Sequence, residues 1–160
     1  MKTKMLIFFV VFFLITGMGA NVFPVYASDL SSLSDMHLIG SELEASPFYV
    51  NCSKCSTTFT VADPGQAHVG VTYNAKADVF TQAKVTVQIQ KKFLGLFWKT
   101  VDINETNNEW VAYSSSVNGY FYKTFDVEGT GTYRAKFTII MYGTNGTSDI
   151  IEDTIECKYS

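Results

Sequence analysis

The most constraining feature of this sequence is a strict alternation of apolar and polar residues in Ala83–Lys91. Val85, Val87 and Ile89 share one parity, while lysine, threonine and glutamine occupy the other. A period of two residues places alternate side chains on opposite faces of a β-strand. One face is then buried and the other is solvated, which is typical of an antiparallel sheet packed on a core.

From Phe48 onward the sequence indicates short strands separated by turn residues. After extended pieces at Phe48–Val50 and Thr57–Val61, the expected strands are Ala67–Asn74, Ala83–Lys91, Phe97–Ile103, Glu109–Ser115, Gly119–Phe125, Thr132–Tyr142 and Ile150–Tyr159. Turn signals lie at Asp63-Pro64-Gly65, Gly129-Thr130-Gly131 and Thr144-Asn145-Gly146. Asn118-Gly119 is the strongest short hairpin signal, so we expect the strands that flank it to pair. Seven or eight strands without a convincing helix predict an all-β fold, a single antiparallel β-sandwich.

Residues 1–27 have the three-part pattern of a secretory signal peptide. Two lysines precede an apolar run, Met5–Ile15, and a small residue, Ala27, ends the segment. The run is well short of the ~20 apolar residues that a membrane-spanning helix needs. We therefore expect cleavage after Ala27 and a secreted, extracellular protein.

The remaining chain divides into a polar, serine-rich segment, 28–47, and a β-sandwich domain, 48–160. We expect the first to be a flexible N-terminal segment or a short pro-segment. The whole chain has 12 basic and 15 acidic residues, and the signal peptide contains two of the basic ones, so the mature net charge is 10 − 15 = −5. This charge argues against nucleic acid as a partner, and against an anionic membrane as a default partner.

The segment from Gly131 to Ala135 resembles the start of strand F in immunoglobulin-like sandwiches. Gly131 and Tyr133 match the tyrosine corner of those domains, while Ala135 stands where their cysteine would be. The resemblance implies that Trp98 lies on the strand carrying the core tryptophan. Without the inter-sheet disulfide, a fibronectin-type or looser bacterial sandwich is the better comparison.

A second resemblance covers Val85–Val101 together with the later GTYRAKF segment. Both are similar to parts of small exported proteins of Gram-positive bacteria, a group without an assigned function. The shared motifs are structural, so this resemblance implies no chemistry.

The domain contains an odd number of cysteines, Cys52, Cys55 and Cys157. Because export favours oxidation, we expect Cys157 to form a disulfide with Cys52 or Cys55. Such a bridge stabilises by up to ~4.7 kcal/mol in the chain-entropy model. The third thiol is then free or pairs with another chain, and the protein is otherwise expected to be a monomer.

Two other interpretations of the cysteines stay open. Cys52 and Cys55 have the C-x-x-C spacing of redox sites, with Lys54 placed to lower a thiol pKa. The same pair with Cys157 and either His37 or His68 has the ligand types of a zinc site. A structural disulfide is favoured because only it follows from compartment and position, and no metal or cofactor is expected.

No nucleophile elbow, zinc-protease helix or phosphate-binding glycine loop occurs in the sequence. Four carboxylates, Asp149, Glu152, Asp153 and Glu156, gather near the last strand. Paired carboxylates serve in glycosidases and calcium sites, but a solvated strand face that protects a sheet edge is favoured.

The most suggestive surface feature is an apolar segment between lysines. Its candidate binding residues are Phe93, Leu94, Leu96, Phe97 and Trp98. An apolar loop with a basic rim is suited to a membrane interface, and exposed apolar patches mark partner sites. The favoured alternative is that these residues cap the open end of the sandwich, because aromatic residues near strand ends usually pack inward.

These features predict a secreted, non-enzymatic β-sandwich that binds a protein, a cell wall or a membrane surface. One alternative is a secreted toxin or bacteriocin-like effector that acts on membranes through the same loop. A second alternative is a hydrolase with its carboxylate site at Glu152 and Glu156.

Overall fold

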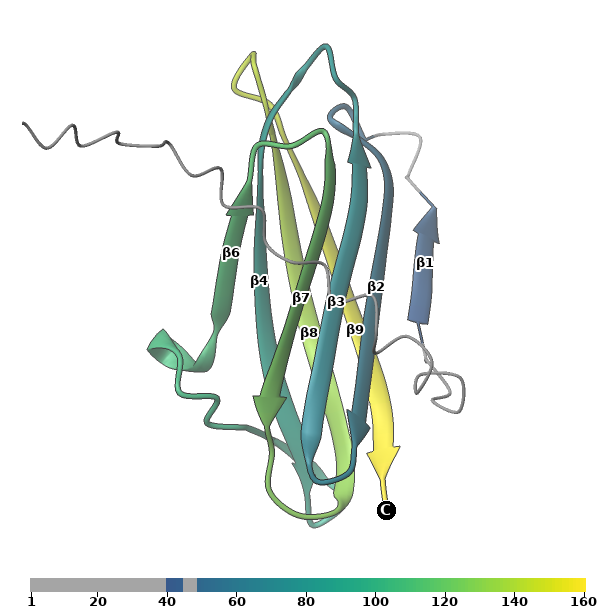
Figure 1. Cartoon of the computed structure of the whole chain (residues 1–160), viewed down its shortest axis with the longest axis vertical. Coiled ribbons are helices and arrows are strands. Elements are labelled where there is room, and N and C mark those ends of the chain that lie inside the picture. Colours follow the sequence, from purple (N-terminus) through teal and green to yellow (C-terminus); the bar gives the residue numbers. More distant parts are fainter. Residues whose placement is uncertain (1–39, 45–48) are drawn as a thin grey trace, which may run out of the picture. The chain divides into compact units, whose positions relative to one another are not determined.

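A computed structural model describes residues 40–44 and 49–160 as two antiparallel β-sheets (Figure 1). The first sheet has the order β1 (Gly40–Glu44), β2 (Cys52–Ala62), β3 (Gln66–Ala75) and β7 (Asn118–Asp126). The second has the order β5 (Phe97–Thr100), β4 (Phe80–Phe93), β8 (Gly131–Gly143) and β9 (Ser148–Tyr159), and β6 (Trp110–Ser114) also pairs with β4. A short 3₁₀ helix, η2 (Thr106–Asn108), precedes β6.

This architecture confirms the predicted antiparallel β-sandwich. Strands β2, β3 and β7 are neighbours in one sheet, and β9, β8 and β4 are neighbours in the other. The predicted signal peptide, 1–27, lies outside the described residues. So does most of the predicted flexible segment, 28–47, of which Gly40–Glu44 form strand β1 along β2.

The alternating residues form the core, as predicted. Val85, Val87 and Ile89 of β4 are fully buried, and the inward parity of β3 and β8 is buried with them. Burial of a complete aliphatic side chain stabilises a fold by roughly 1.5–3 kcal/mol. These central strands are therefore the stable base from which the connecting hairpins extend.

The expected hairpin at Asn118-Gly119 is wrong. Both residues lie within β7, where Asn118 pairs with Asn74 and Gly119 pairs with Tyr73 of β3. The strand before them, β6, pairs instead with β4 in the other sheet. Gly119 is required for space: a Cβ there would lie 2.0 Å from a ring carbon of Tyr73.

The tyrosine corner is present at the start of β8. The Tyr133 hydroxyl donates to the carbonyls of Glu128 and Gly129, each at 2.6 Å. Lys91 Nζ donates to the same Glu128 carbonyl at 2.6 Å and lies over the Tyr133 ring, 5.2 Å from its centroid. These contacts tie the end of β4 to the β7–β8 connection. The expected core position of Trp98 is wrong, since it lies on β5 and is only half-buried.

Gly119→Ala is expected to lower the free energy of unfolding by about 1–3 kcal/mol, because the new methyl group overlaps the buried Tyr73 ring. Urea unfolding measures this loss. Gly70→Ala on β3 is the matched control, since its Cβ would meet a rotatable hydroxyl, Thr58 Oγ1. Equal losses for the two variants would contradict a specific need for glycine beside the Tyr73 ring.

Candidate functional site

The β4–β5 hairpin presents an apolar tip, defined here as Phe93, Leu94, Leu96 and Phe97. Phe93 pairs with Phe97, and the Leu96 amide donates to the Phe93 carbonyl at 3.1 Å. Leu94 and Gly95 both have positive φ, 52° and 70°, as in type I′ hairpin turns. The tip is thus a defined turn at the end of two paired strands.

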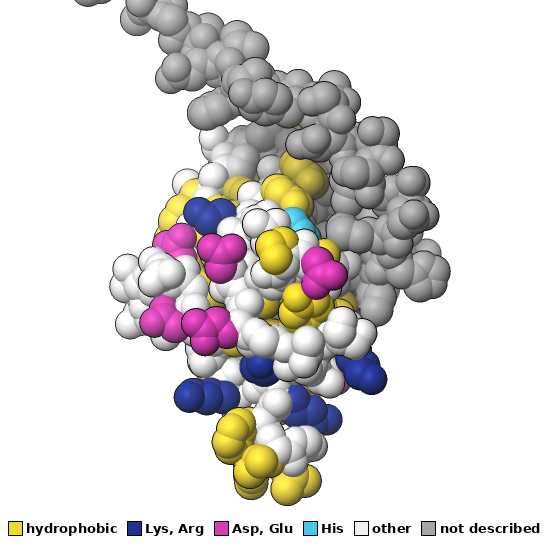
Figure 2. Space-filling model, turned by 60° about the horizontal axis from the view of Figure 1, so that its bottom comes forward, with side chains coloured by type: hydrophobic (Ala, Val, Ile, Leu, Met, Phe, Trp, Pro, Cys, Tyr) yellow, Lys and Arg dark blue, Asp and Glu magenta, His cyan; other side chains and the backbone are white. Residues whose placement is uncertain are grey.

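The tip is open to solvent. Its four side chains are 58%, 75%, 75% and 64% exposed in sequence order. Figure 2 shows hydrophobic side chains gathered at one end of the domain. The favoured expectation that Leu94 and Leu96 cap the sandwich is therefore wrong, because the hairpin extends past the end of the core rather than folding over it.

Directly behind the tip lies a basic collar, which we define as Lys92, Lys99 and Arg134. Lys92 Nζ lies 5.4 Å and the Arg134 guanidinium carbon 4.2 Å from the centroid of the Trp98 ring. Figure 2 shows Lys and Arg side chains next to the hydrophobic end, with carboxylates farther away. Arg134 was not among the predicted site residues, because it comes from β8 and only the strand register brings it to Trp98.

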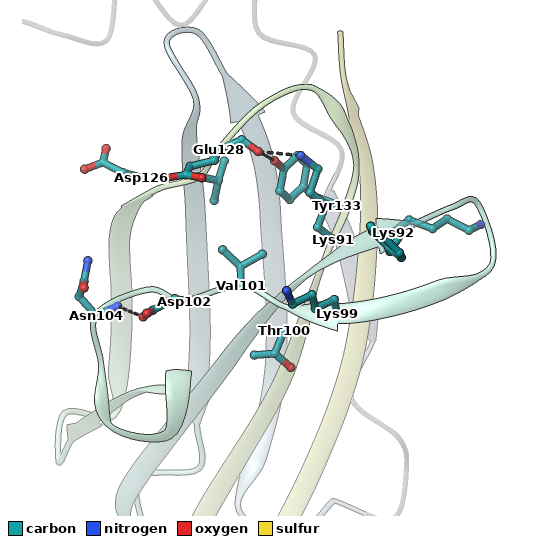
Figure 3. Close-up of a pocket in the computed structure, with 12 residues that line it drawn as sticks. Lys91, Lys92, Lys99, Thr100, Val101, Asp102, Asn104, Asp126, Glu128 and Tyr133 are labelled. Carbon is teal, nitrogen blue, oxygen red and sulfur yellow. Dashed lines mark hydrogen bonds between the residues drawn. The ribbon is translucent and has the colours of Figure 1, made fainter.

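A groove with a volume of about 670 Å³ lies beside the hairpin (Figure 3). Its lining comes from β4, β5, the segment after β5, and the β7–β8 connection, and consists of Lys91, Lys92, Phe93, Lys99, Thr100, Val101, Asp102, Asn104, Asp126, Val127, Glu128 and Tyr133. Lys91 is engaged by backbone carbonyls at its wall. The groove therefore combines amines on the hairpin side with carboxylates on the other side.

Cys157 lies far from Cys52 and Cys55, which corrects the predicted disulfide. Strands β2 and β9 run in the same direction, since Asp149 contacts Cys52 while the Cys157 thiol contacts the backbone of Val61. Cys157 is therefore level with Val61, which lies six residues beyond Cys55 and about 20 Å farther along the strand. Bridged cysteines have Cα atoms within about 7 Å, and all three thiols are free.

The thiols are buried in the core. A bulge in β2 turns both Cys52 and Cys55 inward, at 0% and 1% exposure. Burial raises the pKa of all three thiols, to about 12 for Cys55 and about 11 for Cys157. A reactive redox cysteine needs the opposite, a lowered pKa and partial exposure.

The alternative zinc site also finds no support within the described residues. They contain no group of three or more histidine, cysteine or carboxylate side chains placed to hold a metal. His68 Nδ1 lies 2.7 Å from the Tyr122 hydroxyl and 3.1 Å from Thr124 Oγ1, and its pKa is lowered by burial. His37 lies outside the described residues.

The carboxylates near the last strand separate into two pairs. Asp149 is buried and accepts hydrogen bonds from the backbone N–H groups of Val50, Asn51 and Cys52 at 2.9, 2.6 and 2.8 Å. Asp153 accepts a hydrogen bond from Thr57. Glu152 and Glu156 lie on the exposed face of β9 and do not line the groove.

Asp149→Ala is expected to lower the free energy of unfolding by about 3–5 kcal/mol, because it leaves two buried N–H groups and one partly buried N–H group without an acceptor. Chemical denaturation measures the change. Glu152→Ala removes an exposed carboxylate from the same strand and should change stability by less than about 0.5 kcal/mol. Similar effects of both substitutions would refute a structural role specific to Asp149.

All three thiols are expected to react slowly with a thiol reagent in the folded protein and to count as three after denaturation without reductant. The ordinary pKa of a thiol is 9.0, and burial raises the pKa of Cys55 to about 12 in the folded protein. The free energy of unfolding should therefore fall as pH rises from 9 toward 12, and less so in Cys157→Ala. A non-reducing peptide map that contains a cysteine bridge would contradict this assignment.

Comparison with known proteins adds no functional assignment. No family model matches the chain, and no curated protein matches it significantly. Across residues 40–44 and 49–160 there is also no helix with the length and hydrophobicity to span a membrane.

Proposed function

We propose that this chain is a secreted, non-catalytic binding module that attaches to a surface at or outside the cell envelope through its apolar tip. We further propose two relationships, one to immunoglobulin- or fibronectin-like sandwiches and one to small exported proteins of Gram-positive bacteria. The observation that carries the functional proposal is the exposure of four large apolar side chains on one hairpin.

The turn conformation supports a binding role for the tip. Leu94 occupies a positive-φ position, where glycine, asparagine and aspartate are preferred because a Cβ is disfavoured there. Leucine at this position adds backbone strain and 75% exposed apolar surface. Neither property stabilises the hairpin, so the residue is better explained by contact with a partner.

The scaffold is suited to presenting this tip. The β4–β5 hairpin continues from a buried central strand. At the end of that strand, Lys91 and Tyr133 both hold the carbonyl of Glu128. A preorganised contact loses less conformational freedom on binding than a flexible loop does.

A membrane-active toxin is the second candidate, since it would use the same exposed side chains. The two functions predict different effects on lipid vesicles. Release of a trapped dye by the wild-type protein, abolished in Leu94→Ser/Leu96→Ser, would favour the toxin. Retention of the dye would favour the binding module.

The wild-type protein is expected to cosediment with intact envelopes of Gram-positive cells that secrete it, and Leu94→Ser/Leu96→Ser to remain in the supernatant. Loss of two exposed leucines removes apolar contact without disturbing the core. Ile150→Ser is the matched control, because Ile150 is 57% exposed near the start of β9, away from the tip. Equal sedimentation of the tip variant and the wild type would overturn the proposal.

A further inference from the structure

We infer that the surface entered by the apolar tip is the anionic face of a lipid bilayer. This inference rests on the proposed function, since it names the partner of the same tip. It is carried by the combination of an exposed apolar hairpin end and a basic collar directly behind it (Figure 2).

The distribution of charge matters more here than the net charge. The chain is acidic overall, with a formal net charge of −3, but Lys92 and Lys99 flank the tip on both of its strands. Neither forms an ion pair with a carboxylate in the described part of the chain. Each lysine held near an anionic membrane surface contributes about a fivefold gain in affinity. The local charge therefore complements an anionic lipid surface, whereas the Asp and Glu side chains in view lie farther from the hydrophobic end (Figure 2).

The dimensions of the hairpin fit shallow insertion. Phe93, Leu94 and Gly95 extend beyond Lys92, and a strand rises about 3.3 Å per residue, so the tip reaches at most about 10 Å beyond the collar. Apolar groups of interfacial proteins enter the boundary between headgroups and acyl chains by about 5–10 Å. With the tip at that depth, the collar amines lie at the level of the lipid phosphates.

Two local features remove obstacles to insertion. Within the turn the Leu96 amide donates to the Phe93 carbonyl, which lowers the cost of placing these two backbone groups in lipid. Trp98 lies at the level of the collar, between Lys92 and Arg134. Tryptophan is enriched at this level of membrane proteins because its ring is amphipathic.

Trp98 also provides a direct readout of insertion. The full chain has two tryptophans, and Trp110→Phe leaves Trp98 as the only one. We expect its fluorescence to shift to shorter wavelength, and to be quenched by brominated lipids, when vesicles with about one-third phosphatidylglycerol are added. Pure phosphatidylcholine vesicles should bind at least about tenfold more weakly, and the anionic binding should weaken with added salt.

Two variants separate the roles of the tip and the collar. Leu94→Ser/Leu96→Ser should weaken binding to anionic vesicles by at least about tenfold. Lys92→Gln/Lys99→Gln should weaken it by about tenfold or more and reduce its salt dependence. Lys84→Gln/Lys136→Gln is the matched charge control, because both lysines lie on the middle of the sheet, and it should bind like the wild type.

Each contrary result has a distinct meaning. Tip-dependent binding to cell envelopes without binding to anionic vesicles would overturn the lipid inference and leave the proposed function intact. Binding to neither would overturn both. Equal, salt-insensitive binding to phosphatidylcholine vesicles, or an equal loss in the Lys84→Gln/Lys136→Gln control, would overturn the role of the collar.

Discussion

The carboxylate of Asp149 makes the contact on which the closure of the sandwich depends. It accepts hydrogen bonds from three consecutive backbone N–H groups, those of Val50, Asn51 and Cys52. Charge-assisted bonds of this kind are roughly twice as strong as neutral ones. Because Asp149 belongs to β9 and its donors are Cys52 and the two residues before β2, the contact joins the two sheets.

Asn51 extends this junction on the other side. The side-chain amide of Asn51 donates to the Met141 carbonyl at 3.0 Å. The backbone carbonyl of Asn51 accepts a hydrogen bond from the backbone N–H of Lys76 at 2.8 Å. Gly143 leaves the space, since a Cβ there would lie 2.2 Å from Asn51 Oδ1. A fully buried polar residue is stable only when its groups are paired, and here the pairing fixes the ends of four strands.

The parts predictable from sequence are those governed by local pattern. Alternation identified the buried face of β4, because a two-residue period has one geometric meaning in a strand. The same local logic failed at Asn118-Gly119, where the choice of partner strand overrides the turn signal. It also failed for Cys157, because β2 and β9 run in the same direction in facing sheets, an arrangement that no local pattern encodes.

The exposure of the apolar tip is the feature that local sequence pattern predicts least well. Aromatic residues near strand ends usually pack inward, yet Phe93 and Phe97 pair beyond the end of the core and remain exposed. The length of the hairpin decides whether these residues are buried. Lys91 still faces the core, and its amine donates to the Glu128 carbonyl over the Tyr133 ring. The sandwich ends at that contact, so the residues after Lys91 have no core to cover. The junction at Tyr133 and Lys91 therefore both closes this end of the core and sets how far the hairpin projects. A hairpin anchored in this way keeps the apolar tip ahead of its collar, the spatial order that a bilayer interface requires.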